Sequence, residues 1–197
     1  MAIRCAALTL ALVLAAPAGA ADSDAALAVI RKTLGATQGI VNGEGTRDEK
    51  LAALRSVAQG ILDTRAMGER AMGHELASQT PEQQAEYFEL FDHLMVRAYL
   101  SKLLLFREPR FAYRTPQPEG DFVLVRTKIV TGRDAYDVDY EMVDRDGRWA
   151  AADVIVEGLS LSDNYRDQFA SLLRGRSFEE LLGLMRRKTR RLREEPE

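Results

Sequence analysis

The sequence has little cysteine, histidine and aromatic content, and it has no strong excess of charge of either sign. It holds one cysteine and two histidines among 197 residues, and no spacing among them is typical of a metal site. The net charge of −3 gives no overall basic excess, so we expect no nucleic-acid partner. Glycine-rich phosphate loops and Gly-x-Ser-x-Gly elbows are also absent. These absences predict a protein without a catalytic motif, a metal or a cofactor.

The first twenty residues have the pattern of a cleaved secretory signal peptide. A basic start precedes an apolar run over residues 6–16, and Pro17 ends that run. Small residues, Ala18 and Ala20, then occupy positions −3 and −1 of a cleavage site after Ala20. The run is shorter than the roughly 20 residues that a membrane-spanning helix needs. We therefore predict a signal peptide over residues 1–20, export to the periplasm, and a mature chain of residues 21–197.

The predicted mature chain contains no cysteine, because the single one precedes the cleavage site. It therefore has neither a disulfide nor a thiol nucleophile. A chain of this length buries enough surface to fold without such links. We expect a single domain, and a monomer, since no coiled-coil or exposed-edge pattern indicates a dimer.

Hydrophobic periodicity predicts an α+β fold. The predicted helices cover residues 25–41, 48–61, 64–76 and 80–104, with two more after about residues 162 and 177. The predicted strands cover residues 111–115, 122–130, 136–142 and 149–157. Thr80 and Ser177 each begin a capping box, and the helix between them is expected to be capped near Ser162 or Asp163. The pattern predicts a twisted antiparallel sheet of about four strands wrapped by helices.

Acidic residues alternate with apolar ones on the third predicted strand. Asp137, Asp139 and Glu141 would share one face, with about 7 Å between successive side chains. Paired carboxylates at such a distance suit acid–base chemistry on a sugar, and Asp137 or Asp139 with Tyr140 would then be acid and base in a small cone-shaped enzyme. The alternation favours a simpler interpretation, in which the acids form the exposed face of a half-buried strand and Tyr140 points the other way.

The C-terminal helix ends in a basic stretch. Six of its residues are basic: Arg186, Arg187, Lys188, Arg190, Arg191 and Arg193. Cations near a helix C-terminus complement the helix dipole, and that effect alone explains some of them. Contact with a membrane or a protein partner is the other interpretation, because cations are attracted to anionic surfaces.

Six segments, in order along the chain, carry a resemblance to a known family. They are Ile61–Met67, Thr80–Gln84, Phe88–Tyr99, Val154–Leu161, Asn164–Phe169 and Phe178–Leu182. Together they resemble the MlaC, or toluene-tolerance, family of periplasmic phospholipid-transport proteins, which are auxiliary components of an ABC transporter. One branch of this family is associated with hopanoid lipids.

The resemblance implies a soluble carrier that moves phospholipid, or a related lipid such as a hopanoid, across the periplasm. Its expected partners are an inner-membrane ABC transporter complex and an outer-membrane lipoprotein complex. It also implies that the helices and sheet enclose an apolar pocket for acyl chains. Two acyl chains carry about 30 methylenes at about 0.8 kcal/mol each, so we expect a pocket volume at or above about 1,000 Å³. A lipid-free interaction module with a dry core remains an alternative.

The apolar faces of the long helix, the sheet and the next helix are the expected pocket lining. The predicted lipid-binding residues are Phe91, Leu94, Met95, Tyr99, Tyr136, Val138, Tyr140, Met142, Tyr165 and Phe169.

Overall fold

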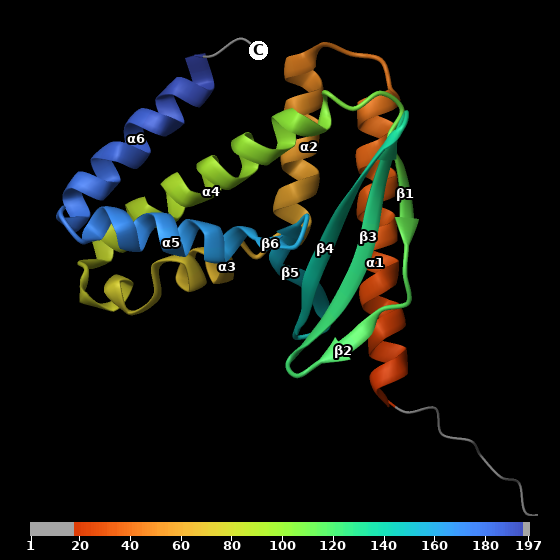
Figure 1. Cartoon of the computed structure of the whole chain (residues 1–197), viewed down its shortest axis with the longest axis horizontal. Coiled ribbons are helices and arrows are strands. Elements are labelled where there is room, and N and C mark those ends of the chain that lie inside the picture. The colour runs from red at the N-terminus through yellow and green to blue at the C-terminus, as the bar shows by residue number, and fades with distance from the viewer. Residues whose placement is uncertain (1–17, 195–197) are drawn as a thin grey trace, which may run out of the picture.

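The computed structural model describes residues 18–194, which form six α-helices, a short 3₁₀ helix and one antiparallel sheet (Figure 1). The helices are α1 (Ala18–Asn42), α2 (Arg47–Ile61), α3 (Thr64–Met72), η1 (Gly73–Ser78), α4 (Pro81–Leu103), α5 (Leu161–Leu173) and α6 (Phe178–Glu194). The strands are β1 (Arg110–Tyr113), β2 (Gln117–Glu119), β3 (Phe122–Thr131), β4 (Asp134–Arg145), β5 (Arg148–Val156) and β6 (Leu159–Ser160). The predicted α+β class is confirmed. Most of the predicted signal peptide, residues 1–17, lies outside the described residues.

The sheet has the order β1–β3–β4–β5–β6, and β2 pairs with β3 on the same edge as β1. It therefore has more strands than the four that periodicity predicts. The two additional strands, β2 and β6, are too short to show alternation. Pro118 lies in β2, where an edge position tolerates the missing backbone donor.

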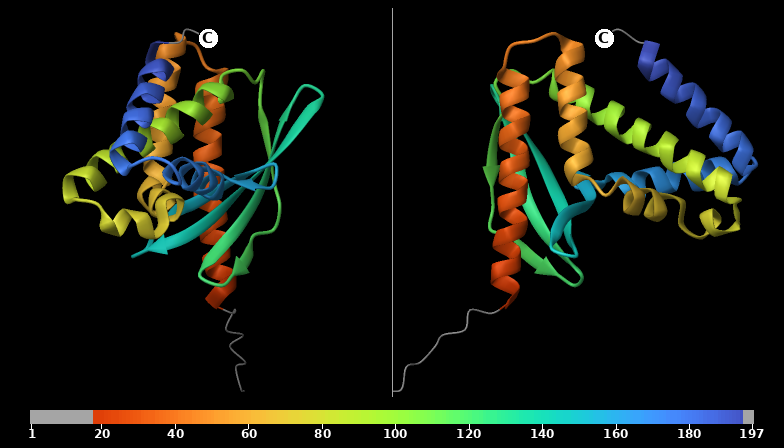
Figure 2. Two further views of the ribbon diagram at one scale, coloured as in Figure 1. Left: turned by 60° about the vertical axis from the view of Figure 1, so that its left-hand side comes forward. Right: turned by 180° about the vertical axis from the view of Figure 1, so that it is seen from behind.

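Alternation along the strands separates an apolar inner face from a charged outer face. On the inner face Val125 lies opposite Tyr140, and helices α1 and α2 cover this side (Figure 2). On the outer face Lys128 forms an ion pair with Asp137, with 3.0 Å between Nζ and Oδ1. Asp137 therefore lies on the side away from the hydrophobic core.

Two hydrophobic clusters cover different ends of the inner face. One joins α3, α4, α5 and α6 to the sheet, and Tyr87 and Phe91 are fully buried at its centre. The other joins α1 to the sheet around Ile30, Val125 and Met142. The side chains within each cluster are closely packed. Packing is incomplete in the space between the two clusters.

Helix capping follows the sequence at two of the three predicted positions. The capping boxes that begin at Thr80 and Ser177 are both present. The prediction for α5 was wrong, because Ser160, and neither Ser162 nor Asp163, is the cap. The hydroxyl oxygen of Ser160 accepts a hydrogen bond from the backbone N–H of Asp163 at 3.0 Å.

A partly buried ionic network fixes α3 and α5 to the sheet. Asp153 on β5 is fully buried and accepts a hydrogen bond from the Ser162 hydroxyl at 2.8 Å. Arg70 of α3 lies 3.4 Å from Asp153, donates to Glu141 at 2.8 Å, and donates twice to Asp163 at 3.0 and 2.9 Å. One guanidinium therefore neutralises carboxylates from β4, β5 and α5.

Replacing Arg70 by methionine should destabilise the protein by about 2–4 kcal/mol, because the buried carboxylate of Asp153 would lose its cation. The cost stays below that of a fully buried pair, since the Arg70 side chain is partly exposed. Urea unfolding measures the difference. The matched control is Arg148→Met, an exposed arginine for which we expect a change within about 0.5 kcal/mol. Equal effects of the two substitutions would show that the network does not stabilise the fold.

Asp163 should contribute to acid unfolding. The hydrogen bonds from Arg70 hold the pKa of Asp163 below its usual value. Its stabilising effect is therefore present above the unfolded pKa of about 3.9 and is lost as the pH falls through the folded pKa. Asp163→Asn should lose less stability than the wild type on acidification below about pH 4, as followed by chemical unfolding across pH.

Glu141 gives a control of opposite sign, because burial raises its pKa. Its protonation favours the folded state, so Glu141→Gln should lose more stability than the wild type as the pH falls towards the unfolded pKa of about 4.3, a higher range than that of Asp163. Identical pH profiles for both variants and the wild type would contradict these assignments.

Candidate functional site

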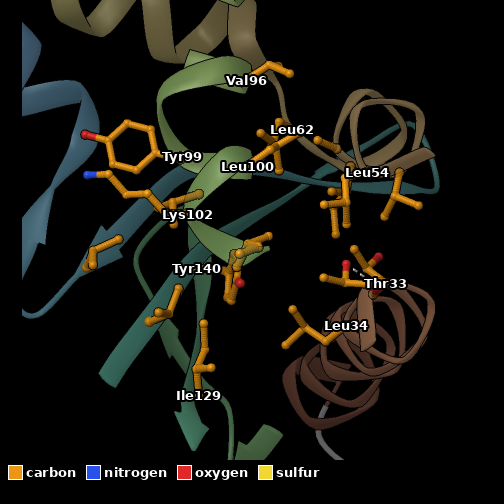
Figure 3. A pocket seen from close by; sticks show the side chains of 18 of the residues that line it. Thr33, Leu34, Leu54, Leu62, Val96, Tyr99, Leu100, Lys102, Ile129 and Tyr140 are labelled. Atoms are coloured by element: carbon orange, nitrogen blue, oxygen red, sulfur yellow. Dashed lines mark hydrogen bonds between the residues drawn. The ribbon is translucent and has the colours of Figure 1, made fainter. Parts of the chain in front are cut away.

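An apolar cavity of about 210 Å³ lies between the two hydrophobic clusters (Figure 3). Its wall includes Leu34 of α1, Ala58 of α2, Tyr99 of α4, Val138 of β4 and Val154 of β5. These residues come from segments that are far apart in the sequence. The cavity exists because the helices that cover the two ends of the sheet meet over its middle without filling the space between them.

The cavity wall offers almost no polar chemistry. The Thr37 hydroxyl is satisfied by the Thr33 carbonyl at 3.0 Å. Burial raises the pKa of Tyr140 well above its usual value, so its phenol stays neutral. Among the described residues that line the cavity, Lys102 is the one with a charge, and its Nζ lies 5.5 Å from the ring centroid of Tyr99. Such a wall suits the apolar part of a ligand whose polar or anionic end lies near Lys102.

Four of the ten predicted site residues line this cavity. They are Met95, Tyr99, Val138 and Tyr140. The sequence analysis did not anticipate the contribution of α1 and α2, which supply Leu34, Leu54 and Ala58 to the wall. A helix of small and aliphatic residues shows the same periodicity whether it faces a core or a cavity. The sequence therefore does not indicate that α1 and α2 line the cavity.

The other six predicted residues do not line the cavity: Phe91, Leu94, Tyr136, Met142, Tyr165 and Phe169. The Phe91 ring packs edge-on against Tyr165, with centroids 5.4 Å apart inside the aromatic cluster. Met142 is buried in the cluster beneath α1. Tyr136 lies at the start of β4 and packs on Phe106, with ring centroids 5.4 Å apart. Helix α4 buries two faces, and periodicity does not distinguish the core side from the cavity side.

The cavity is smaller than the sequence analysis predicted. Its volume of about 210 Å³ lies below the usual range of about 300–1,000 Å³ for ligand sites. The predicted volume at or above about 1,000 Å³ was wrong for this structure, because side chains of α2 and α4 approach each other across the space (Figure 3).

The proposed acid–base pair is not assembled. Asp137 pairs with Lys128 on the outer face of the sheet. Asp139 is on the same face, where it accepts a hydrogen bond from the backbone N–H of Thr127 at 3.3 Å, and its partial burial raises its pKa. Tyr140 lies on the inner face and lines the cavity. The strand therefore separates the carboxylates from Tyr140, as its alternation predicts.

Within residues 18–194, no group of histidine, cysteine and acidic side chains is arranged to hold a metal ion. No helix of this part of the chain is both long and apolar enough to cross a membrane.

The basic residues of α6 differ in their exposure to solvent. Arg186 joins α6 to α4 through Glu86, with 2.7 Å between Nη2 and Oε2, and it also donates to Glu179 at 2.9 Å. The exposed residues of the stretch are Arg187, Lys188, Arg190 and Arg191. The side chain of Arg193 lies outside the described part of the structure. One of the six predicted contact residues is therefore engaged in holding two helices together.

Comparison with known proteins identifies a family and similar solved structures. Residues 31–187 match the family model described as MlaC protein. The structure is similar to that of a phospholipid-binding protein from Ralstonia solanacearum in complex with a phospholipid. The TM-score is 0.77 at 23% sequence identity, and the match covers 85% of this chain and 98% of that chain. Because the family model spans most of the sequence, and the segments that carry the resemblance lie within one continuous fold, this protein belongs to the MlaC family.

Proposed function

We propose that this MlaC-family protein is a lipid carrier and not an enzyme, with a phospholipid as its ligand. The observation that carries the proposal is the cavity between the two hydrophobic clusters, whose described wall is mostly aliphatic and aromatic and has Lys102 as its charged residue. The phospholipid bound by the Ralstonia solanacearum protein, which has a similar fold, supports the same ligand class. A hopanoid, which is also largely apolar, is the related ligand that this wall would accept.

Lipid binding requires the cavity to enlarge. A volume of about 210 Å³ is too small for two acyl chains. Met95 of α4 belongs to one hydrophobic cluster and Ile61 of α2 to the other, so α4 and α2 would separate at the boundary between the two clusters. The burial of about 30 methylenes at about 0.8 kcal/mol each would offset the cost of this separation. Release then needs a partner that favours the closed, empty state.

The partners that we propose follow from family membership. The carrier would act in the periplasm after removal of residues 1–20, and would receive and deliver lipid at an inner-membrane ABC transporter complex and an outer-membrane lipoprotein complex. A monomer suits this shuttling role.

Native mass spectrometry of the purified protein, expressed from its full coding sequence, tests the proposal. We expect a fraction of the protein to carry one additional mass equal to that of a diacyl phospholipid or a triterpenoid, which solvent extraction then identifies. A protein of bare polypeptide mass that takes up no lipid from phospholipid vesicles would contradict the proposal.

A tryptophan placed on the cavity wall should block lipid without unfolding the protein. In Val138→Trp the indole would enter the cavity and occupy the volume of an acyl chain. We expect a loss of most bound lipid and a cost in stability of about 1–3 kcal/mol from overpacking. Lipid per protein and urea unfolding measure the two effects.

The matched control is Ala135→Trp, an exposed position on the same strand. We expect this variant to retain its lipid. If a folded Val138→Trp protein carries as much lipid as the control, the cavity is not the binding site.

A further inference from the structure

The α4 tip, residues 101–107, comprises the last residues of α4 and the residues that follow it. It exposes an apolar side chain between two cations. Leu103 and Phe106 line the cavity, whereas Leu105 is 63% exposed. Lys102 and Arg107 flank this short apolar run, and both are exposed. The tip is therefore packed on its cavity side and open on the other.

A second exposed apolar side chain lies beside this tip. Tyr136, at the start of β4, is 36% exposed and packs on Phe106. Over the part of the chain with described side chains, the large hydrophobic residues that are exposed are Leu105, Tyr136 and Leu159. Two of these three therefore neighbour Phe106, so the exposed apolar patch of Leu105 and Tyr136 is continuous with the cavity wall.

The end of the molecule that holds this patch is basic. The α4 tip, the α1–α2 turn, the β3–β4 turn and the C-terminal end of α6 all lie at the same end in three views (Figures 1 and 2). These segments, residues 42–50, 101–110, 131–136 and 187–192, hold ten basic and five acidic residues. Their net charge is +5, whereas the whole chain has a net charge of −3. The rest of the protein is therefore strongly acidic, and the charge is polarised along the molecule.

We propose that this basic end docks on an anionic lipid bilayer. Leu105 and Tyr136 would enter the interfacial layer, and the surrounding cations, among them Lys188 and Arg190, would meet lipid phosphates. The inference rests on the proposed function, because a carrier exchanges its cargo where lipid is present. Docking by this end would place the cavity wall at Phe106 next to the bilayer.

The composition of the patch favours a bilayer over a protein partner. A standard protein interface uses about 20–30 residues a side around a well-packed apolar centre, and two exposed apolar side chains fall far short of that. A leucine and a tyrosine surrounded by lysine and arginine are instead typical of segments that lie at a membrane surface. Transient binding also suits a protein that must leave the bilayer again.

Vesicle flotation tests the charged part of the surface. The full chain should float with vesicles that contain phosphatidylglycerol and should bind vesicles of phosphatidylcholine alone much more weakly. Each basic residue near an anionic surface contributes about a five-fold change in partitioning, so Lys188→Gln with Arg190→Gln should weaken binding about 25-fold. The control, Lys32→Gln with Arg148→Gln, removes the same charge at exposed positions outside the basic end and should retain binding.

The apolar part has its own matched pair. Leu105→Ser should weaken vesicle binding about ten-fold, because the variant loses the favourable transfer of a leucine side chain from water into the bilayer. Leu159 is 70% exposed on β6, away from the basic end (Figure 1), so Leu159→Ser should leave binding unchanged. Equal losses in the two serine variants, or in the two charge variants, would overturn the assignment of the docking surface.

Failure of docking and failure of the carrier function are distinguishable. Flotation reports vesicle binding, whereas lipid extraction reports cargo. A wild-type protein that contains extractable lipid but does not float with phosphatidylglycerol vesicles overturns the docking proposal alone, and assigns this end to a protein partner. A protein that neither floats nor contains lipid overturns both proposals.

Discussion

The apolar inner face of the sheet must be covered, and two separate groups of helices cover it. The inner face of β4 carries large apolar side chains from Tyr136 to Met142. On the neighbouring strand β3, Thr127 is the polar residue of the same face, opposite Val138. One group of helices packs at each end, and α2 and α4 meet over the middle without filling the space beneath them. The cavity is the consequence of this incomplete cover. Its largely apolar wall follows directly, since most side chains there lie on the buried face of a helix or strand.

The connections between helices and sheet differ in kind around the cavity. Arg70 and Asp153 hold α3 and α5 to the sheet through charge and directed hydrogen bonds, and such a network has one preferred geometry. The tip of α4 instead faces α2 through aliphatic side chains, which can slide or separate with little directional cost. The ionic network therefore acts as a fixed point, and the apolar contact is where the walls can part. In the proposed carrier, this asymmetry would let the wall open between α2 and α4 while α3 and α5 stay fixed to the sheet.

Much of the fold could be predicted from local patterns in the sequence. Alternation located the four longer strands, and the capping box at Thr80 located the start of α4. The binding site could be predicted only in part. Phe91 and Tyr99 are both apolar positions on one helix, but Phe91 faces the aromatic cluster and Tyr99 faces the cavity, because α4 packs against different partners along its length. Arg70 carried no signal, because its partners are 71 and 93 residues away in the sequence. Tertiary contacts of this kind are not encoded in any local pattern.

The central claim is that acyl chains occupy the space between the two hydrophobic clusters. The most direct measurement is a crystal structure of the protein loaded with a phospholipid whose acyl chains carry bromine, with the bromine atoms located by anomalous scattering. The account predicts anomalous peaks inside the cavity, in contact with Ala58, Tyr99 and Val138, and α2 and α4 further apart than in the present structure. Bromine peaks confined to the outer surface, with the cavity unchanged, would contradict it.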